Sequence, residues 1–284
     1  MLGMAGGGDG VFVPSRLGAR FGPYFELDVL APPQADGAGV AAGPPAGWAA
    51  VADLSDPLTG AFARRAGAVR AALAAGGGLA TEAVDERVAV SVAQLGVCAR
   101  LVAPALALAV ATGRPPEFSP RLLYWRDRLG GPFPLALGGP PVPVGQATTG
   151  TGPSDRLGRG LVDGMLLPVV APIVSAIERH HPVSSKILWG NVASGLAGAA
   201  KMIGQAEPAL AAPAWGVVDA LCAGDGPLRG TGARVAPARF GRRSCCLIYR
   251  LDSGAGAGAG ADGDRARRAP SRSALCEDCV LRFR

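Results

Sequence analysis

The residues best suited to chemistry in this sequence are four cysteines near its C-terminal end. Cys245 and Cys246 are adjacent, residues 247–275 follow, and Cys276 and Cys279 then form a CxxC motif. Two pairs of thiolates suit a tetrahedral zinc ion or an iron–sulfur cluster. Paired zinc ligands are usually separated by roughly two to four residues, so that a turn directs both sulfurs at one ion. The adjacent pair departs from that habit, and the spacing therefore favours an iron–sulfur cluster over zinc.

Disulfide bonds are the third possibility for these cysteines. The first 15 residues lack the basic and apolar regions of a secretion signal, so we expect a cytoplasmic protein, in which disulfides are rare. Adjacent cysteines also cannot easily bond to each other without distorting the peptide between them. Cys98 and Cys222 each lie among apolar residues of an expected helix, and we interpret both as small hydrophobic core residues.

Three segments of the sequence share features with one known family. RRSCCLIYRL (242–251) is followed by CEDCVL (276–281), ARLVAPALALAVATG occupies 99–113, and KILWGNVASGLAGAAKMI occupies 186–203. These segments resemble parts of the FhuF-like ferric siderophore reductases, and they follow one another in the same order as in that family. Along the chain, the first is an apolar helix that contains proline, the second a Trp-Gly-Asn segment that opens a helix of small residues, and the third a CC pair with a terminal CxxC. The resemblance covers about 99–284, and the cysteine signature is its most specific part.

The resemblance implies a cytoplasmic ferric-siderophore reductase with a [2Fe–2S] cluster. The ligands of the cluster would be Cys245, Cys246, Cys276 and Cys279. One electron would pass to the Fe(III) of a hydroxamate-type siderophore, and Fe(II) would be released because hydroxamate oxygens hold it far less tightly. Such a reaction requires no nucleophile or general base, so we expect no catalytic residue beyond the cluster. A separate carrier must donate the electrons, because the Gly-rich run 254–260 lacks the strand–helix context of a dinucleotide-binding motif.

The sequence departs from this family in the spacing of the cysteine pairs. The family has a much shorter connection, and the surplus here coincides with the low-complexity segment 252–274, which is rich in Gly, Ala and Arg. Lengthening a flexible loop almost threefold costs only about 1 kcal/mol of closure entropy. We therefore expect a surface loop that leaves the cluster intact.

Arginines flank the CC pair and are candidates for a supporting role. Arg242, Arg243 and Arg250 would favour the reduced, more negative cluster and so raise its potential. Solvated arginines are the alternative interpretation.

Two further groups of residues have a structural and a functional interpretation. His180 and His181 are better explained as a polar helix end than as iron ligands, because a hexadentate siderophore leaves no coordination site open. Trp125, Arg126 and Trp189 are candidates to line a substrate pocket, although tryptophans more often belong to the core.

Composition excludes several other classes of protein. The chain has 284 residues, is 49% hydrophobic and has a formal net charge of +6. The apolar fraction suffices for a large core and is too high for a disordered chain. The charge is too diffuse for a nucleic-acid partner. Polar residues and prolines interrupt the longest apolar runs before they reach the roughly 20 residues of a membrane span, so we expect none.

Two alternatives to a reductase stay open at this point. One is a non-catalytic protein that binds or senses iron or a siderophore. The other is an interaction module stabilised by zinc.

The expected fold is mainly α with a small β-hairpin or sheet. A helical domain would occupy 1–236, and a short cluster-binding extension 237–284. We expect helices over 53–75, 81–112 and 159–179, and a fourth that begins at Asn191 as its N-cap. Pro104 should kink or divide the second of these helices. Two short strands are expected within 121–137.

Overall fold

The computed structural model describes residues 16–30, 44–139, 142–143, 152–251 and 275–282. The segment 252–274, and with it the prediction of a surface loop, lies outside these residues. The α-helices are α1 (Leu17–Phe21), α2 (Ala61–Gly77), α3 (Glu86–Thr112), α4 (Pro153–Leu161), α5 (Ala171–His180), α6 (Ser185–Ala206) and α7 (Pro208–Ala223). A π-helical segment, Val162–Val170, joins α4 to α5, and short 3-10 helices cover Pro23–Phe25, Val51–Leu54, Thr81–Ala83 and Val280–Arg282.

The strands are short and form three small sheets within the described residues. They are β1 (Asp28–Val29), β2 (Ala49–Ala50), β3 (Pro116–Glu117), β4 (Leu123–Trp125), β5 (Leu135–Leu137), β6 (Val142–Pro143), β7 (Gly232–Ala236) and β8 (Arg239–Arg242). One sheet has the order β1-β5-β4-β2, in which only β1 and β5 are parallel, while β3 pairs with β6 and β7 with β8. The expected mainly α fold with a small β element is confirmed, as are the two strands within 121–137.

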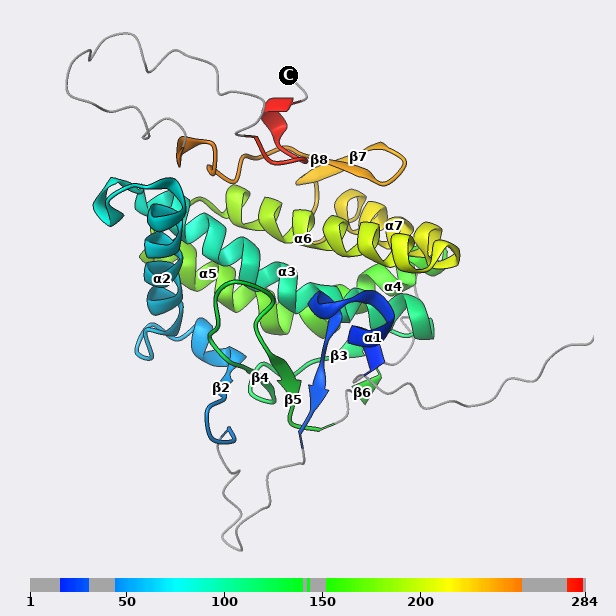
Figure 1. Cartoon of the computed structure of the whole chain (residues 1–284). Helices are drawn as coiled ribbons and strands as arrows, with labels where there is room; N and C mark the ends of the chain where they lie inside the picture. Colours follow the sequence, from blue (N-terminus) through cyan, green and yellow to red (C-terminus); the bar gives the residue numbers. More distant parts are fainter. Residues whose placement is uncertain (1–15, 31–43, 140–141, 144–151, 252–274, 283–284) are drawn as a thin grey trace, which may run out of the picture.

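Helix α3 is the centre of the core. From Val97 to Val110 nearly every side chain of this helix is buried, and a helix that is apolar on all sides must be covered on all sides. Helix α6 lies against α3 on one side, while the four-stranded sheet lies on the other, as Figure 1 shows. The β7–β8 hairpin and the C-terminal 3-10 helix cover the outer side of α6.

A buried arginine ties α3 to the segments on the sheet side. The side chain of Arg100 donates hydrogen bonds to the carbonyl oxygens of Phe133 (2.9 Å), Tyr24 (3.1 Å) and Glu26. Burial lowers the pKa of this guanidinium to about 10, which still leaves it charged at neutral pH. These bonds satisfy three carbonyl groups of irregular backbone that would otherwise lack a donor.

The contact between α3 and α6 depends on small residues. A Cβ atom at Gly195 would lie 2.8 Å from Cα of Ala99, so only glycine allows the two helices to approach this closely. The sequence interpretation of this segment as a tight packing surface is therefore correct at Gly195.

Four expectations about helices differ in detail from the structure. The helix expected over 53–75 is a 3-10 helix at Val51–Leu54 followed by α2, which begins at Ala61. Pro104 does not divide α3, because the buried apolar surface around it favours a continuous helix over the cost of the lost hydrogen bond. Helix α6 begins at Ser185, and Asn191 lies in its interior, since the core supplies tertiary hydrogen bonds for the Asn191 side chain. The expected helix 159–179 contains the π-helical turns around Pro168.

Two helical stretches are long and apolar enough to span a membrane by length and composition. They are Glu86–Thr112 and Pro153–His180, and 72% and 61% of their most apolar windows are buried inside the protein. Core helices of this kind meet the same criterion, so the stretches are weak evidence for a membrane protein. The absence of a span and the cytoplasmic location stay predictions.

The two glycines of α6 that lie three residues apart should respond in opposite ways to substitution by alanine. Gly195→Ala should destabilise the protein by about 1–3 kcal/mol, because the new methyl group would overlap the backbone of α3. Gly198→Ala should stabilise it by about 0.5–1 kcal/mol, because a Cβ there meets no atom within 4 Å and alanine favours a helix. Urea unfolding of both variants measures the difference. Equal stabilities would contradict the close approach of α3 and α6.

Candidate metal centre

The structure brings the four predicted cysteines together beside α6. The sulfurs of Cys246 and Cys276 are 3.5 Å apart, and those of Cys245 and Cys279 are 3.8 Å apart. Each close pair therefore combines one cysteine of the CC motif with one of the CxxC motif. Cys246 and Cys279 are buried, whereas Cys245 and Cys276 are partly exposed.

Local backbone geometry positions both motifs. In the CxxC motif the amide of Cys279 donates to the carbonyl of Cys276 (3.2 Å), and the resulting turn brings the two thiols to one side of the chain. After the CC motif, Leu247 adopts a left-handed conformation with φ of 70°, and its amide donates to Sγ of Cys245 at 3.3 Å. A leucine with positive φ costs of order 1–3 kcal/mol, which the surrounding structure must offset.

The separation of the sulfurs fits ligands of a metal centre. Two thiolates on a tetrahedral metal, with metal–sulfur bonds of about 2.3 Å, lie about 3.8 Å apart. Both observed pairs are close to this value. Among the described residues, no group of three or more His, Cys, Asp or Glu side chains is close enough together to hold a metal ion as it stands. A four-cysteine zinc site and a [2Fe–2S] cluster both place thiolates at this separation, so the cluster stays a prediction.

An unsatisfied hydroxyl next to the CC motif also fits such a group. The Oγ of Ser244 is buried and has no hydrogen-bond partner within the described part of the chain. It lies so close to α6 that a Cβ on Gly190 would be only 2.0 Å from it, which explains the glycine of the Trp-Gly-Asn segment. A metal–sulfur group held by the adjacent Cys245 would offer this hydroxyl an acceptor.

The side chain of Arg242 contacts one of the cysteines and is completely buried. Its guanidinium donates to Sγ of Cys276 at 2.8 Å and to Oδ1 of Asn191 at 2.7 Å. The Nε atom lies 3.0 Å from a carboxylate oxygen of Asp278, an ion pair without the alignment of a hydrogen bond, and the backbone amide of Arg242 donates to the Asp278 carbonyl. Ser194 on α6 donates to the same carboxylate.

Asn191 connects this arginine to the core of the protein. Its side-chain amide donates to the backbone and hydroxyl oxygens of Ser91 (both 3.1 Å) and to the amide oxygen of Gln94 (2.9 Å) on α3. Gln94 in turn donates to Sγ of Cys98 at 3.1 Å. A continuous chain of hydrogen bonds therefore runs from α3 through α6 and β8 to the CxxC motif.

Hydrogen bonds from two neighbouring thiols, with a nearby positive charge, favour a thiolate at Cys246. The thiols of Cys245 and Cys276 donate hydrogen bonds to this sulfur and, with the charge of Arg242, lower the pKa of Cys246. The same hydrogen bonds, together with burial, raise the pKa values of Cys245 and Cys276. Burial opposes the charge of Arg242, but the carboxylate of Asp278 and the two nearby sulfurs raise its pKa, so the guanidinium stays charged. A positive charge and a first thiolate are thus in place for metal binding.

The structure separates the arginines that the sequence grouped together. Arg242 contacts a cysteine, whereas the side chain of Arg243 is exposed and its backbone amide donates to Thr231. Arg250 pairs with Asp85, the N-cap residue of α3, at 3.1 Å. The expected influence on the cluster is therefore restricted to Arg242 by direct contact.

Other predicted residues lie apart from the cysteines. His181 follows the end of α5, pairs with Glu86 at 3.1 Å and packs against the ring of Phe62, as expected of a polar helix end. Trp125 and Arg126 do line a hollow of about 210 Å³ on the sheet side, but Trp189 on α6 is not part of it. The three residues therefore do not form one pocket, and Trp125 is a core residue with an exposure of 2%.

The two remaining cysteines are core residues, as predicted. Cys98 is fully buried in α3, and burial raises the pKa of its thiol to about 12. Cys222 is buried in α7, where burial also raises its thiol pKa. Both thiols therefore stay protonated at neutral pH.

The comparisons with known proteins add no relative. No family model matches the chain, and no curated protein matches it significantly. The resemblance to FhuF-like reductases thus depends on the three sequence segments alone and stays a prediction.

Sequence reasoning missed the roles of Asn191, Ser244 and Asp278. The signal for Asn191 was present, because a polar residue in a run of small and apolar residues on a buried helix requires partners. Asp278 lies inside the CxxC motif, where its charge complements the nearby arginine. Nothing in the sequence indicated that Ser244 would contact Gly190.

Substitution of single cysteines should separate ligands from core residues. A serine at any of the four clustered positions should remove most iron and sulfide from the protein, because serine is a poor substitute for a thiolate ligand. The matched controls Cys98→Ser and Cys222→Ser should retain both. Iron and acid-labile sulfide per chain are the measured quantities. Full metal content in Cys276→Ser would contradict the assignment.

Proposed function

We propose that this protein is a ferric-siderophore reductase that transfers one electron from a [2Fe–2S] cluster to siderophore-bound Fe(III). The observation that carries the proposal is the pairing of four thiols in two couples, with a buried arginine hydrogen-bonded to one of them. When bound, the cluster would supply the one-electron chemistry. The protein would hold it through Cys245, Cys246, Cys276 and Cys279.

The residues around the thiols suit a group that gains negative charge on reduction. Arg242 places a permanent positive charge at 2.8 Å from one ligand sulfur, in a position with little access to water. Asn191 and Asp278 hold this guanidinium in place. A fixed charge of this kind stabilises the reduced state over the oxidised state and raises the reduction potential.

The arrangement also gives electrons access to the site. Cys245 and Cys276 are partly exposed, whereas Cys246 and Cys279 are buried. Electrons can therefore enter or leave the group at these two cysteines. A separate electron donor in the cytoplasm completes the proposed reaction.

Two alternatives have the same four thiols but different chemistry. A protein that only binds or senses iron or a siderophore would hold the cluster without transferring its electron to the substrate. A zinc-stabilised interaction module would be colourless, and the adjacent cysteines depart from the usual spacing of paired zinc ligands.

A single-turnover experiment tests the proposal. The anaerobic protein, reduced with dithionite and freed of excess reagent, is mixed with a ferric trihydroxamate and a chelator that is specific for Fe(II). We expect one Fe(II) for each reduced cluster, together with return of the oxidised visible spectrum. A cluster that stays reduced in the presence of the chelate would support the sensing alternative instead.

Replacement of Arg242 should change the potential, whereas replacement of Arg243 should not. Arg242→Gln removes the charge next to Cys276 and should lower the midpoint potential by tens of millivolts, so that the cluster is harder to reduce. Arg243→Gln is the matched control, because this exposed side chain is adjacent in sequence. Potentiometric titration followed in the visible spectrum measures both. Equal shifts, or a potential that Arg242→Lys fails to restore in part, would contradict a role for the buried charge.

A further inference from the structure

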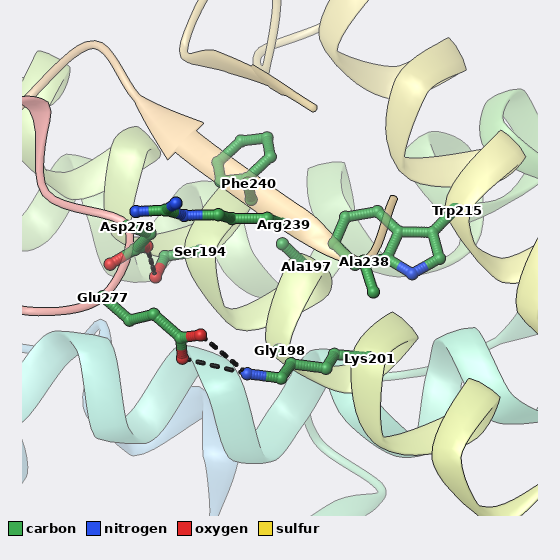
Figure 2. Close-up of a pocket in the computed structure, with 10 residues that line it drawn as sticks. All are labelled: Ser194, Ala197, Gly198, Lys201, Trp215, Ala238, Arg239, Phe240, Glu277 and Asp278. Atoms are coloured by element: carbon green, nitrogen blue, oxygen red, sulfur yellow. Dashed lines mark hydrogen bonds and ion pairs between the residues drawn. The ribbon is translucent and has the colours of Figure 1, made fainter. Parts of the chain in front are cut away.

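We propose that a hollow beside the CxxC motif is the docking site of the ferric siderophore, an inference that rests on the function proposed above. The hollow has a volume of about 180 Å³ and lies between α6, α7, the β7–β8 turn and the CxxC segment. Figure 2 shows Glu277 and Asp278 on one side, Trp215 on the opposite side, and Gly198 of α6 next to Lys201.

The hollow is next to the proposed cluster ligands. Glu277 and Asp278, which line it, are the two residues between Cys276 and Cys279. Successive Cα atoms are about 3.8 Å apart, so a molecule in the hollow contacts residues one peptide unit from two ligand cysteines. The electron would therefore have a short path from the cluster to a bound chelate.

The charged residues that line the hollow balance in number, with Lys201 and Arg239 against Glu277 and Asp278. Lys201 contacts both carboxylate oxygens of Glu277 at 2.8 and 3.0 Å, and the carboxylate of Asp278 is engaged by Arg242 and Ser194. The dashed contacts in Figure 2 belong to two of these pairs. Equal numbers of positive and negative side chains suit a neutral ligand that has amide groups, while the rings of Trp215 and Phe240 are buried, with exposures of 4% each.

A ferric trihydroxamate has this character, because three monoanionic hydroxamates cancel the charge of Fe(III). An acidic electron carrier would instead be attracted by a surface with an excess of positive charge. The balance of charges therefore favours the chelate over the carrier as the occupant of this hollow.

The size of the hollow indicates partial enclosure of the chelate. Sites that surround a small molecule have volumes of roughly 300–1,000 Å³, so this hollow would accept one side of the complex. Contact on one side is sufficient, because the electron passes without a bond between iron and protein. The cluster loses one electron, Fe(III) gains it, and the hydroxamates take up protons from water as Fe(II) dissociates.

Gly198 provides a way to fill the hollow without disturbing the fold. A Cβ at this exposed position would meet no atom within 4 Å, and the backbone does not require glycine. Gly67 in α2 has the same properties and does not line the hollow. Gly198→Trp and Gly67→Trp are therefore a matched pair of variants.

Two measurements compare these variants with the unmodified protein. Calorimetric titration with a Ga(III) trihydroxamate, which has the charge and shape of the ferric complex but accepts no electron, reports binding alone. Reoxidation of the reduced protein by a ferric trihydroxamate and by ferricyanide separates docking from electron donation. We expect Gly198→Trp to weaken Ga(III) complex binding and slow reoxidation by the ferric chelate, each by at least about tenfold. Reoxidation by ferricyanide should be unchanged, and Gly67→Trp should match the unmodified protein throughout.

The outcomes distinguish the hollow from the function. Unchanged affinity and unchanged reoxidation by the chelate in Gly198→Trp would overturn the docking site and leave the reductase standing. If ferricyanide but not the ferric chelate oxidised the unmodified protein, the reductase itself and the docking site would both be overturned. Gly198→Leu replaces the tryptophan variant if that variant does not fold, with the same two criteria.

Discussion

The buried charge of Arg242 is the constraint on which the candidate centre depends. A guanidinium with no access to water requires partners for its donors and a compensating negative charge. Asn191, Asp278 and Cys276 supply them from a helix and from the CxxC motif. Loss of any one partner would leave a buried charge partly unsatisfied, and this couples the position of the C-terminal segment to the helical core.

The same constraint explains why the Trp-Gly-Asn segment contacts the residues next to the CC motif, although the two segments are far apart in the sequence. The Trp-Gly-Asn segment is not a helix start but a contact surface, in which Gly190 makes room for Ser244 and Asn191 binds Arg242. The partner residues of these contacts, Ser244 and Arg242, lie next to the CC motif in the sequence. A substitution in this part of α6 would therefore shift the cysteine pairs without contacting them. This dependence is a physical reason for the Trp-Gly-Asn segment and the CC motif to occur in the same protein.

The general fold could be predicted from the sequence because its signals are local. Apolar periodicity indicated α3, and two apolar runs around Gly130 and Gly131 indicated the β4–β5 pair. The four cysteines were identified from type and spacing, and the structure places them together. The β7–β8 hairpin spans the domain boundary that we placed between 236 and 237, so the extension begins within a paired structure.

What could not be predicted depends on contacts between distant residues. Asn191 is as acceptable at a helix start as in a helix interior, and only the partners on α3 and β8 decide between the two. Arg242 and Arg243 are equivalent in sequence, yet β8 directs the first into the core and leaves the second exposed. The hollow beside the CxxC motif is likewise formed by α6, α7 and the hairpin turn, which share no pattern in the sequence.

The central claim is that the two mixed cysteine pairs each hold one iron of a binuclear cluster. The most direct measurement is the metal and sulfide content of the unmodified protein purified without oxygen, combined with its visible spectrum. The account predicts a red-brown protein with two irons and two acid-labile sulfides for each chain. A colourless protein that contains one zinc ion for each chain, with no sulfide, would contradict it.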